Sequence, residues 1–184
     1  LLQSPRVLIV SEAGAGKTHE CRAERDERWA AGEPAFFFEL AELSRNDPCE
    51  LLDSEELRRF DAWRVSQSDV AIVFLDSVDE LKLTLGTLEN ALKRLKRAVD
   101  GQLGRLKVVI TSRPIPIERA LLERLLPVPD FSVAQATEQA FADIAMHRSK
   151  AEEKDKPADW RCVALMPLSG EQMRAFAELE GVTD

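Results

Sequence analysis

The sequence predicts an α/β domain built on a mostly parallel sheet with helices on both faces. Short apolar runs alternate along the 184 residues with longer segments that carry an apolar stripe at helical spacing, the order expected of strands joined by crossover helices. One run, residues 70–75, is apolar without interruption, as in strands that are covered on both faces. The length suits a single domain with a sizeable core.

The first half of the chain holds three of the expected strands and three helix starts. Gly32 and Pro34 end the first helix, and Asp47 before Pro48 begins the second. β-branched and aromatic runs mark the strands. The expected order is a strand at 7–10, a helix from Lys17 to about Ala31, a strand at 35–40, a helix start at Asp47, a helix from Ser54 and a strand at 70–75.

The second half continues the alternation. A helix over 85–103 has an apolar stripe at Leu88, Ala91, Leu92, Leu95 and Val99. After it we expect a strand at 106–111, helices at 117–126 and at 134 to about 148, a charged surface loop at 149–157 and a fifth strand at 162–165. Ser169 and Gln172 resemble a capping box for a final helix that stops at Gly181.

The charge balance argues against nucleic acid as a partner. The chain has 25 basic and 33 acidic residues, for a net charge of −8, whereas binding to a phosphate backbone needs clustered cations. The exception is the basic cluster Lys93, Arg94, Lys96 and Arg97. It lies on a helix opposite the apolar stripe, and we interpret it as a solvated outer face.

Other features bear on location and extent. The three cysteines match no metal spacing and no disulfide framework, which suggests a reducing compartment. We find no signal peptide and no apolar run that could span a bilayer, so we expect a cytoplasmic protein without a membrane partner. Because Leu1 is not an initiator Met, we expect residues 1–184 to be one domain of a larger protein.

A phosphate-binding loop stands between the first strand and the first helix. Its residues are Ser11, Glu12, Ala13, Gly14, Ala15, Gly16, Lys17 and Thr18, a Walker A-like sequence. Successive backbone N–H groups and the helix N-terminus suit a phosphate oxyanion there. Lys17 would reach the β- and γ-phosphates and Thr18 would offer a hydroxyl to Mg²⁺. The sequence therefore predicts a nucleoside triphosphate with Mg²⁺.

Two positions, one in this loop and one just after it, depart from the usual pattern or allow a second interpretation. The usual pattern has Gly where Ser11 stands, so the entry turn must tolerate a Cβ. His19 follows Thr18 on the first helical turn and is included in the nucleotide site, with an exposed helix position as the alternative. An ordinary glycine-rich turn followed by Lys and Thr is the alternative for the whole segment.

Acidic residues follow the third strand. Ligands of open α/β sheets lie beyond the carboxyl ends of the strands, and Asp76 stands there, where a carboxylate can hold Mg²⁺ through its water shell. Glu80 or Asp79, a few residues on, would orient or deprotonate the water that attacks the γ-phosphate. Solvated loop acids, or a helix cap at Asp79, are the alternatives.

Arg113 follows the fourth strand in the order Thr111, Ser112, Arg113, Pro114. A guanidinium at the carboxyl end of a strand can stabilise the charge of the γ-phosphate because it binds phosphate with two N–H groups. The alternative is an ion pair with one of the nearby acids.

Three segments in this order resemble the NACHT family of the STAND (signal-transduction) P-loop NTPases: SEAGAGKT, FLDSVDEL and VVITSRP. In that family a small residue follows the Mg²⁺-associated Asp, and extra acids stand a few positions further on. Ser77 matches the small residue, and Asp79 and Glu80 match the acids. The similarity spans most of the chain, with little signature in residues 115–160.

The resemblance implies a three-layer P-loop NTPase sandwich with strand order 2-3-4-1-5. It implies ATP or ADP with Mg²⁺ as cofactors, and a switch whose partners are other domains of the parent chain and, in the full-length protein, a homo-oligomer. Two functions stay open: a slowly hydrolysing ATPase switch, and a non-hydrolysing interaction module with a structural nucleotide. A small-molecule kinase lacks an arginine-rich lid, and a GTPase lacks the guanine-reading Asn/Thr-Lys-x-Asp motif.

Overall fold

Five parallel strands form one sheet in the order β2-β3-β4-β1-β5. The computed structural model describes residues 4–81, 85–129, 160–165, 170–172 and 174. The strands are β1 (Arg6–Val10), β2 (Ala35–Glu39), β3 (Ala71–Asp76), β4 (Leu106–Ser112) and β5 (Arg161–Ala164). This arrangement confirms the predicted α/β class and the predicted strand order.

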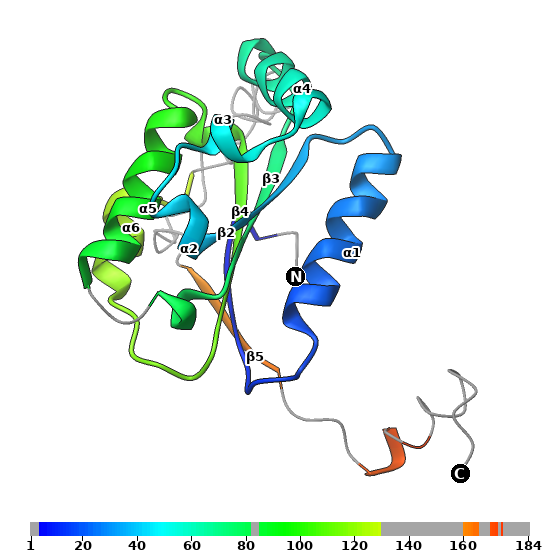
Figure 1. Ribbon diagram of the computed structural model, residues 1–184, viewed down its shortest axis with the longest axis vertical. Helices are drawn as coiled ribbons and strands as arrows, with labels where there is room; N and C mark the ends of the chain where they lie inside the picture. The colour runs from blue at the N-terminus through cyan, green and yellow to red at the C-terminus, as the bar shows by residue number, and fades with distance from the viewer. Residues whose placement is uncertain (1–3, 82–84, 130–159, 166–169, 173, 175–184) are drawn as a thin grey trace, which may run out of the picture.

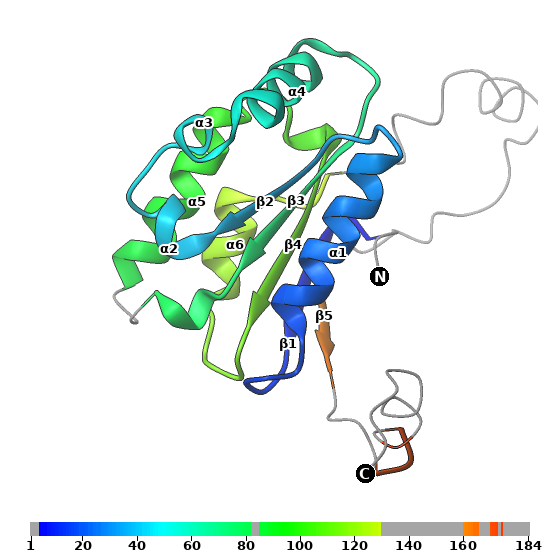
Figure 2. The same cartoon turned by 45° about the vertical axis from the view of Figure 1, so that its right-hand side comes forward.

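Helices cover both faces of the sheet, which makes three layers (Figures 1 and 2). One face carries α1 (Lys17–Ala30), and the other carries α5 (Leu85–Ala98) and α6 (Arg119–Leu125). Between β2 and β3 the chain forms α2 (Leu40–Leu43), α3 (Pro48–Leu51) and α4 (Ser54–Val65), and short 3₁₀ turns η1 (Val78–Glu80) and η2 (Leu103–Arg105) flank α5.

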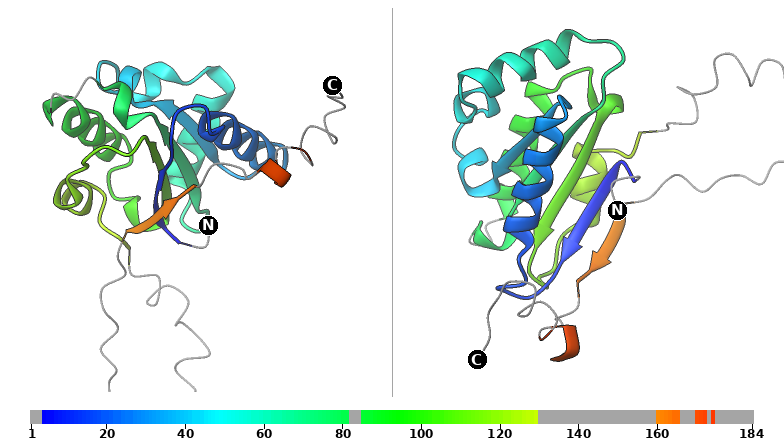
Figure 3. Two further views of the ribbon diagram at one scale, coloured as in Figure 1. Left: turned by 90° about the horizontal axis from the view of Figure 1, so that it is seen from below. Right: turned by 90° about the vertical axis from the view of Figure 1, so that its right-hand side faces the viewer.

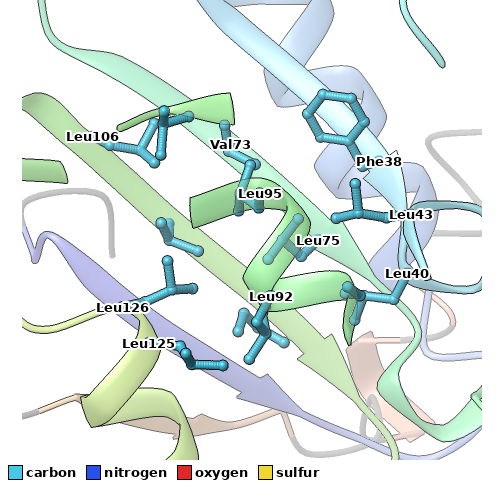
Figure 4. Close-up of a cluster of buried hydrophobic side chains, with 14 of the residues drawn as sticks. Phe38, Leu40, Leu43, Val73, Leu75, Leu92, Leu95, Leu106, Leu125 and Leu126 are labelled. Carbon is cyan, nitrogen blue, oxygen red and sulfur yellow. The ribbon is translucent and has the colours of Figure 1, made fainter. Parts of the chain in front are cut away.

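The core follows from the alternation of side chains along each strand. In β3, Ala71, Val73 and Leu75 belong to the cluster on the α5 side, and Ile72 and Phe74 to the cluster on the α1 side. Figure 4 shows the first cluster, in which Leu92 and Leu95 of α5 reach the strands. The predicted stripe of α5 is buried as expected, with Leu88 partly exposed.

Local sequence signals set several boundaries. Asp47 and Asp53 begin α3 and α4 with capping boxes that close on Glu50 and Glu56, as the Asp-Pro signal predicts for α3. The predicted helix over 85–103 ends early, at Ala98, because the chain turns at Gly101 with a φ of 75°. The short helix α2 has no counterpart among the predicted elements.

Other expected elements fall outside the described residues. These are the helix over 134–148 and the charged loop at 149–157. Of the predicted final helix only residues 170–172 and 174 are described, and they are helical. None of the described helices combines the length and the apolar character that crossing a bilayer needs.

The basic cluster of α5 lies on an outer surface, as predicted. Lys93 pairs with Glu89 at 2.9 Å, and Arg94 pairs with Asp47 of the α3 N-cap at 2.7 Å. Lys96 donates to the carbonyl of Arg124 at 3.4 Å. These side chains tie α5 to its neighbours.

Arg6 is a cation buried at the start of β1, with 0% exposure. Its guanidinium donates to the carbonyls of Leu126 at 3.2 Å and of Leu103 at 3.1 Å, and also to those of Pro5 and Leu106. Burial lowers the pKa of Arg6 to about 10, so it remains charged at neutral pH. It joins β1, the start of β4 and the end of α6.

We expect Arg6→Met to lower the free energy of unfolding by about 3 kcal/mol, because a buried carbonyl left without its donor costs about 1–3 kcal/mol. Denaturant unfolding measures the difference. Arg58→Met is the matched control, because the side chain of Arg58 is 69% exposed. A variant as stable as the parent would show that desolvating the guanidinium costs as much as its hydrogen bonds return.

A strained turn follows β3. Ser77 has a φ of 64° and is the one non-glycine residue with positive φ in the described part of the chain. Its N–H donates to Thr111 Oγ1 at 3.0 Å, which holds the turn against β4. A Cβ in this left-handed conformation costs about 1–2 kcal/mol. The turn directs Asp79 and Glu80, in η1, away from the line of the strand.

Comparing two substitutions of Ser77 isolates the strain, since both remove the hydroxyl. We expect Ser77→Gly to unfold with a free energy about 1 kcal/mol higher than Ser77→Ala. At Ser68, an exposed residue outside the positive-φ set, alanine should instead be the more stable by about 0.5 kcal/mol. Thermal melting of the four variants decides, and the same sign at both positions would contradict strain at Ser77.

Candidate functional site

The phosphate loop joins β1 to α1 at the carboxyl end of the sheet, the end seen in the left view of Figure 3. Gly14 and Gly16 have φ values of 76° and 79°, which glycine adopts without strain. Gly16 is the N-cap of α1 and supplies no side-chain cap. The first N–H groups of this 14-residue helix therefore remain available to an anion.

Lys17 directs its ammonium back onto the loop. Nζ donates to the carbonyls of Ser11 at 2.8 Å and Glu12 at 2.9 Å, and to Ser11 Oγ at 3.0 Å. All three ammonium hydrogens thus have oxygen partners. A bound phosphate would offer charged oxygens in place of some of these neutral ones, and charge-assisted hydrogen bonds are the stronger kind.

Ser11 occupies the entry position without strain. Its side chain is buried, its φ is not positive, and its N–H donates to the carbonyl of Ser112 at 3.1 Å. The turn therefore accepts a Cβ, as the sequence requires of it. The hydroxyl of Ser11 adds a partner for Lys17 that glycine would not provide.

Asp76 is the buried acid of the site, with 3% exposure. Its Oδ2 accepts from Thr18 Oγ1 at 2.7 Å and from Ser77 Oγ at 3.2 Å, and its Oδ1 accepts from Thr111 Oγ1. All three donors are neutral hydroxyls, and within the described ranges no cationic side chain pairs with Asp76. A buried carboxylate in this setting gains from a nearby cation.

The donor set of Thr18 and Asp76 fits Mg²⁺. Both offer hard oxygen atoms and they lie 2.7 Å apart, whereas the described residues hold no group of three His, Cys, Asp or Glu side chains that could bind a metal by themselves. Mg²⁺ beside phosphates uses few protein ligands and keeps several waters. Two oxygens at this position are therefore sufficient.

The two later acids have different surroundings. Asp79 is committed to Arg113: Oδ2 pairs with Nε at 2.8 Å, and Oδ1 accepts from the backbone N–H at 3.1 Å. Glu80 is exposed, and the described part of the chain gives its carboxylate no partner. Of the two, Glu80 is the acid that is free to bind a water.

Several of the predicted site residues line one hollow of about 370 Å³. It is lined by residues of the phosphate loop and by His19, Ser77, Asp79, Glu80 and Arg113. His19 is exposed and lines its edge. Three predicted site residues do not line it, namely Ser11, Glu12 and Asp76. They bond instead to residues that do: Lys17 donates to Ser11 and Glu12, and Thr18 donates to Asp76.

Sequence analysis missed Thr111 as a residue of this site. Thr111 is fully buried near the end of β4, where it donates to Asp76 and accepts from Ser77. In the sequence Thr111 is marked only by its hydroxyl at the end of an apolar strand. Such hydroxyls are too common to indicate a site residue unless the strand order is known. The sequence analysis gave an ion pair with a nearby acid as the alternative for Arg113 but did not say which acid. The structure shows that it is Asp79, which lies 34 residues away in the chain.

Cys21 lies behind the site, on the side of α1 that faces the sheet. Burial raises the pKa of its thiol to about 12, with smaller contributions from Asp76, Glu20 and Glu24. The thiol is therefore protonated at neutral pH, and it packs against the strands as a small apolar side chain.

No protein-family model matches this chain, and no curated protein sequence matches it. Among solved structures it is similar to AMPPCP-bound DnaA from Aquifex aeolicus, with 13% identity, a TM-score of 0.44 and coverage of 97% of this chain and 55% of that one. It is also similar to a Walker-type ATPase of Pyrococcus abyssi, with 17% identity, a TM-score of 0.45 and coverage of 96% and 54%. The chain spans about half the length of each.

Proposed function

We propose that this domain binds ATP with Mg²⁺ and hydrolyses it slowly, as the switch module of a NACHT-type signal-transduction NTPase. The observation that carries the proposal is the 2.7 Å contact between Thr18 and Asp76. It joins the helix that follows the phosphate loop to the acid at the end of β3, which supports a phosphate site and a metal site beside each other.

The phosphates and the Mg²⁺ of the nucleotide each have a matching group. The loop N–H groups and Lys17 would hold the β- and γ-phosphates, with the N-terminus of α1 behind them. Thr18 and Asp76 would hold Mg²⁺, which screens the phosphate charge when bound. The cost of keeping the Asp76 carboxylate buried beside neutral hydroxyls supports this assignment, since a cation offsets it.

Hydrolysis requires a water in line with the bond from the γ-phosphorus to the β–γ bridging oxygen. Glu80 lines the hollow, and no described residue pairs with its exposed carboxylate, so it would orient this water and accept its proton as the phosphorus–oxygen bond forms. The bridging oxygen leaves with ADP, and inorganic phosphate is released. Arg113, on the same hollow, would stabilise the charge on the γ-phosphate oxygens.

The switch role rests on the resemblance of the three motifs to NACHT proteins. In such a switch, the bound nucleotide determines how the domain contacts other domains of the parent chain and further copies of itself. The origin of the groups around the hollow supports this role, because the phosphate loop follows β1, the acids of η1 follow β3 and Arg113 follows β4. Their arrangement can therefore depend on whether a γ-phosphate lies between them and the loop.

Lys17→Ala tests nucleotide binding. With ATP at a hundred times its dissociation constant, binding stabilises the folded protein by about 2.7 kcal/mol. Loss of the ammonium should weaken ATP about a hundredfold and leave a stabilisation of only about 0.4 kcal/mol. Thermal melting with Mg²⁺ and ATP, ADP or GTP measures both the effect and the base preference.

Lys96→Ala is the matched control, since Lys96 lies on the outer side of α5 and should leave the ATP-dependent shift intact. A shift that is the same in Lys17→Ala and in the parent protein would rule out the phosphate loop as the binding site. A parent protein whose melting no nucleotide changes would contradict the proposal as a whole.

A second function is a non-hydrolysing module in which ADP or ATP is a structural ligand. It is favoured by the surroundings of Glu80, because no side chain in the described ranges holds that carboxylate in place, and a general base works best when it is positioned. Such a module would show a nucleotide-dependent melting shift without release of phosphate.

Glu80→Gln separates the two functions. If Glu80 acts on the water, phosphate release from ATP should fall about a hundredfold while ATP affinity stays unchanged, because the amide keeps the size of the side chain. Phosphate release under single-turnover conditions is the measurement. Glu123→Gln, at an exposed position of α6, should have no effect. Equal, measurable rates in both variants would rule out Glu80 as the residue that acts on the water, whereas a parent protein that binds ATP and releases no phosphate would favour the non-hydrolysing module.

A further inference from the structure

We propose that Asp79 is a positioning residue that orients Arg113 toward the γ-phosphate and thereby sets the preference of the site for ATP over ADP. The inference rests on the proposed function, because it needs a nucleotide in the hollow. It differs from the role that the sequence suggests for Asp79, which is contact with the attacking water.

Both oxygens of Asp79 are bound to the same residue. Oδ2 pairs with Arg113 Nε at 2.8 Å, and Oδ1 accepts from the backbone N–H of Arg113 at 3.1 Å. The carboxylate is the enclosed partner, since its side chain is 12% exposed and that of Arg113 is 53% exposed. Asp79 is thus the fixed end of the pair, and it fixes both the main chain and the side chain of Arg113.

The pairing leaves the outer part of the guanidinium available. Arg113 has five N–H donors in a planar fork, and its ion pair with Asp79 is formed at Nε, the inner end of that fork. The described residues give the two Nη atoms no partner, and Arg113 lines the hollow together with Gly14 and Lys17. A phosphate can therefore bind the Nη atoms while Asp79 holds Nε, so the two anions need not compete for one donor.

An exposed arginine without such an anchor samples many rotamers, and ordering it on binding costs free energy. The ion pair with Asp79 restricts the Arg113 side chain before the nucleotide binds, so less free energy is lost in ordering it on binding. The turn at Ser77 makes the pairing possible, because it brings η1 beside the end of β4, where Ser77 already bonds to Thr111. Pro114 after Arg113 further restricts the backbone there.

The γ-phosphate is the group that Arg113 would recognise. The loop and Lys17 would take the β-phosphate in either nucleotide, whereas Arg113 follows β4 and lines the hollow beside its partner Asp79. Loss of its orientation should therefore weaken ATP and leave ADP nearly unchanged. This difference distinguishes positioning from a general effect on folding.

The test is a double-mutant cycle on nucleotide affinity. Dissociation constants for ATP and ADP with Mg²⁺ are measured for the parent chain, Asp79→Ala, Arg113→Ala and the double variant. We expect either single variant to lower the ratio of ATP to ADP affinity about tenfold, as for loss of one charge-assisted hydrogen bond. The double variant should lower it no further, because both changes remove one interaction.

Two further variants sharpen the result. Asp79→Asn keeps an acceptor for the N–H of Arg113 but loses the ion pair, so its ratio should lie between those of the parent and of Asp79→Ala. Asp61→Ala removes the acid of an exposed pair with Arg64 on α4 and should leave the ratio unchanged.

Three outcomes would overturn the inference while nucleotide binding itself stands. They are an equal fall in both affinities, additive effects in the double variant, and tighter ATP binding by Asp79→Ala, which would mean that Asp79 competes with the phosphate. Absence of nucleotide binding in the parent chain is the separate result that contradicts the proposed function, and the inference with it.

Discussion

The buried carboxylate of Asp76 is the interaction on which the arrangement of this site depends. It accepts hydroxyl hydrogen bonds from Thr18 at the start of α1, from Ser77 in the next turn and from Thr111 near the end of β4. One charge therefore ties together the first helix, the third strand and the fourth. Three neutral donors make the burial tolerable, and they leave a negative charge directly behind the phosphate loop. This negative charge would attract the cation of a magnesium–nucleotide complex, the ligand that we propose for the site.

The strand order makes this convergence possible. Because β4 lies between β1 and β3, its carboxyl end has the phosphate loop on one side and the acids of η1 on the other. Thr111 faces Asp76, and two residues later Arg113 faces Asp79. Both contacts depend on β3 and β4 being neighbours in the sheet. The strained conformation of Ser77 completes the arrangement, because it turns the chain back toward β4 as soon as β3 ends.

Much of the fold could be predicted because its signals are local. Apolar runs give the strands, Asp47 before Pro48 gives the start of α3, and the loop from Ser11 to Thr18 gives the join between β1 and α1. The early end of α5 was missed, because the apolar spacing continues to predict a helix beyond Ala98, whereas the chain turns at Gly101. Thr111 could not be predicted from local signals, and the alternative of an ion pair at Arg113 left open which nearby acid would be its partner. Both depend on which strands are neighbours, and the strand order entered the sequence analysis only through the resemblance to a known family.

The two neighbouring acids of η1, Asp79 and Glu80, have different surroundings, which suit them to the different roles that we propose. Asp79 is mostly enclosed, so its charge needs a fixed partner, and Arg113 supplies one through two contacts. Glu80 is exposed, so its charge is stabilised by water and needs no partner among the side chains. An enclosed, paired acid such as Asp79 can hold another residue in place. An exposed acid to which the described residues offer no partner, such as Glu80, can contact water but is not held in one orientation. If Glu80 acts on the water, as proposed, hydrolysis should be slow, because the acid that is held in place is Asp79. Slow turnover suits a switch, whose state must last longer than a single encounter with its partners.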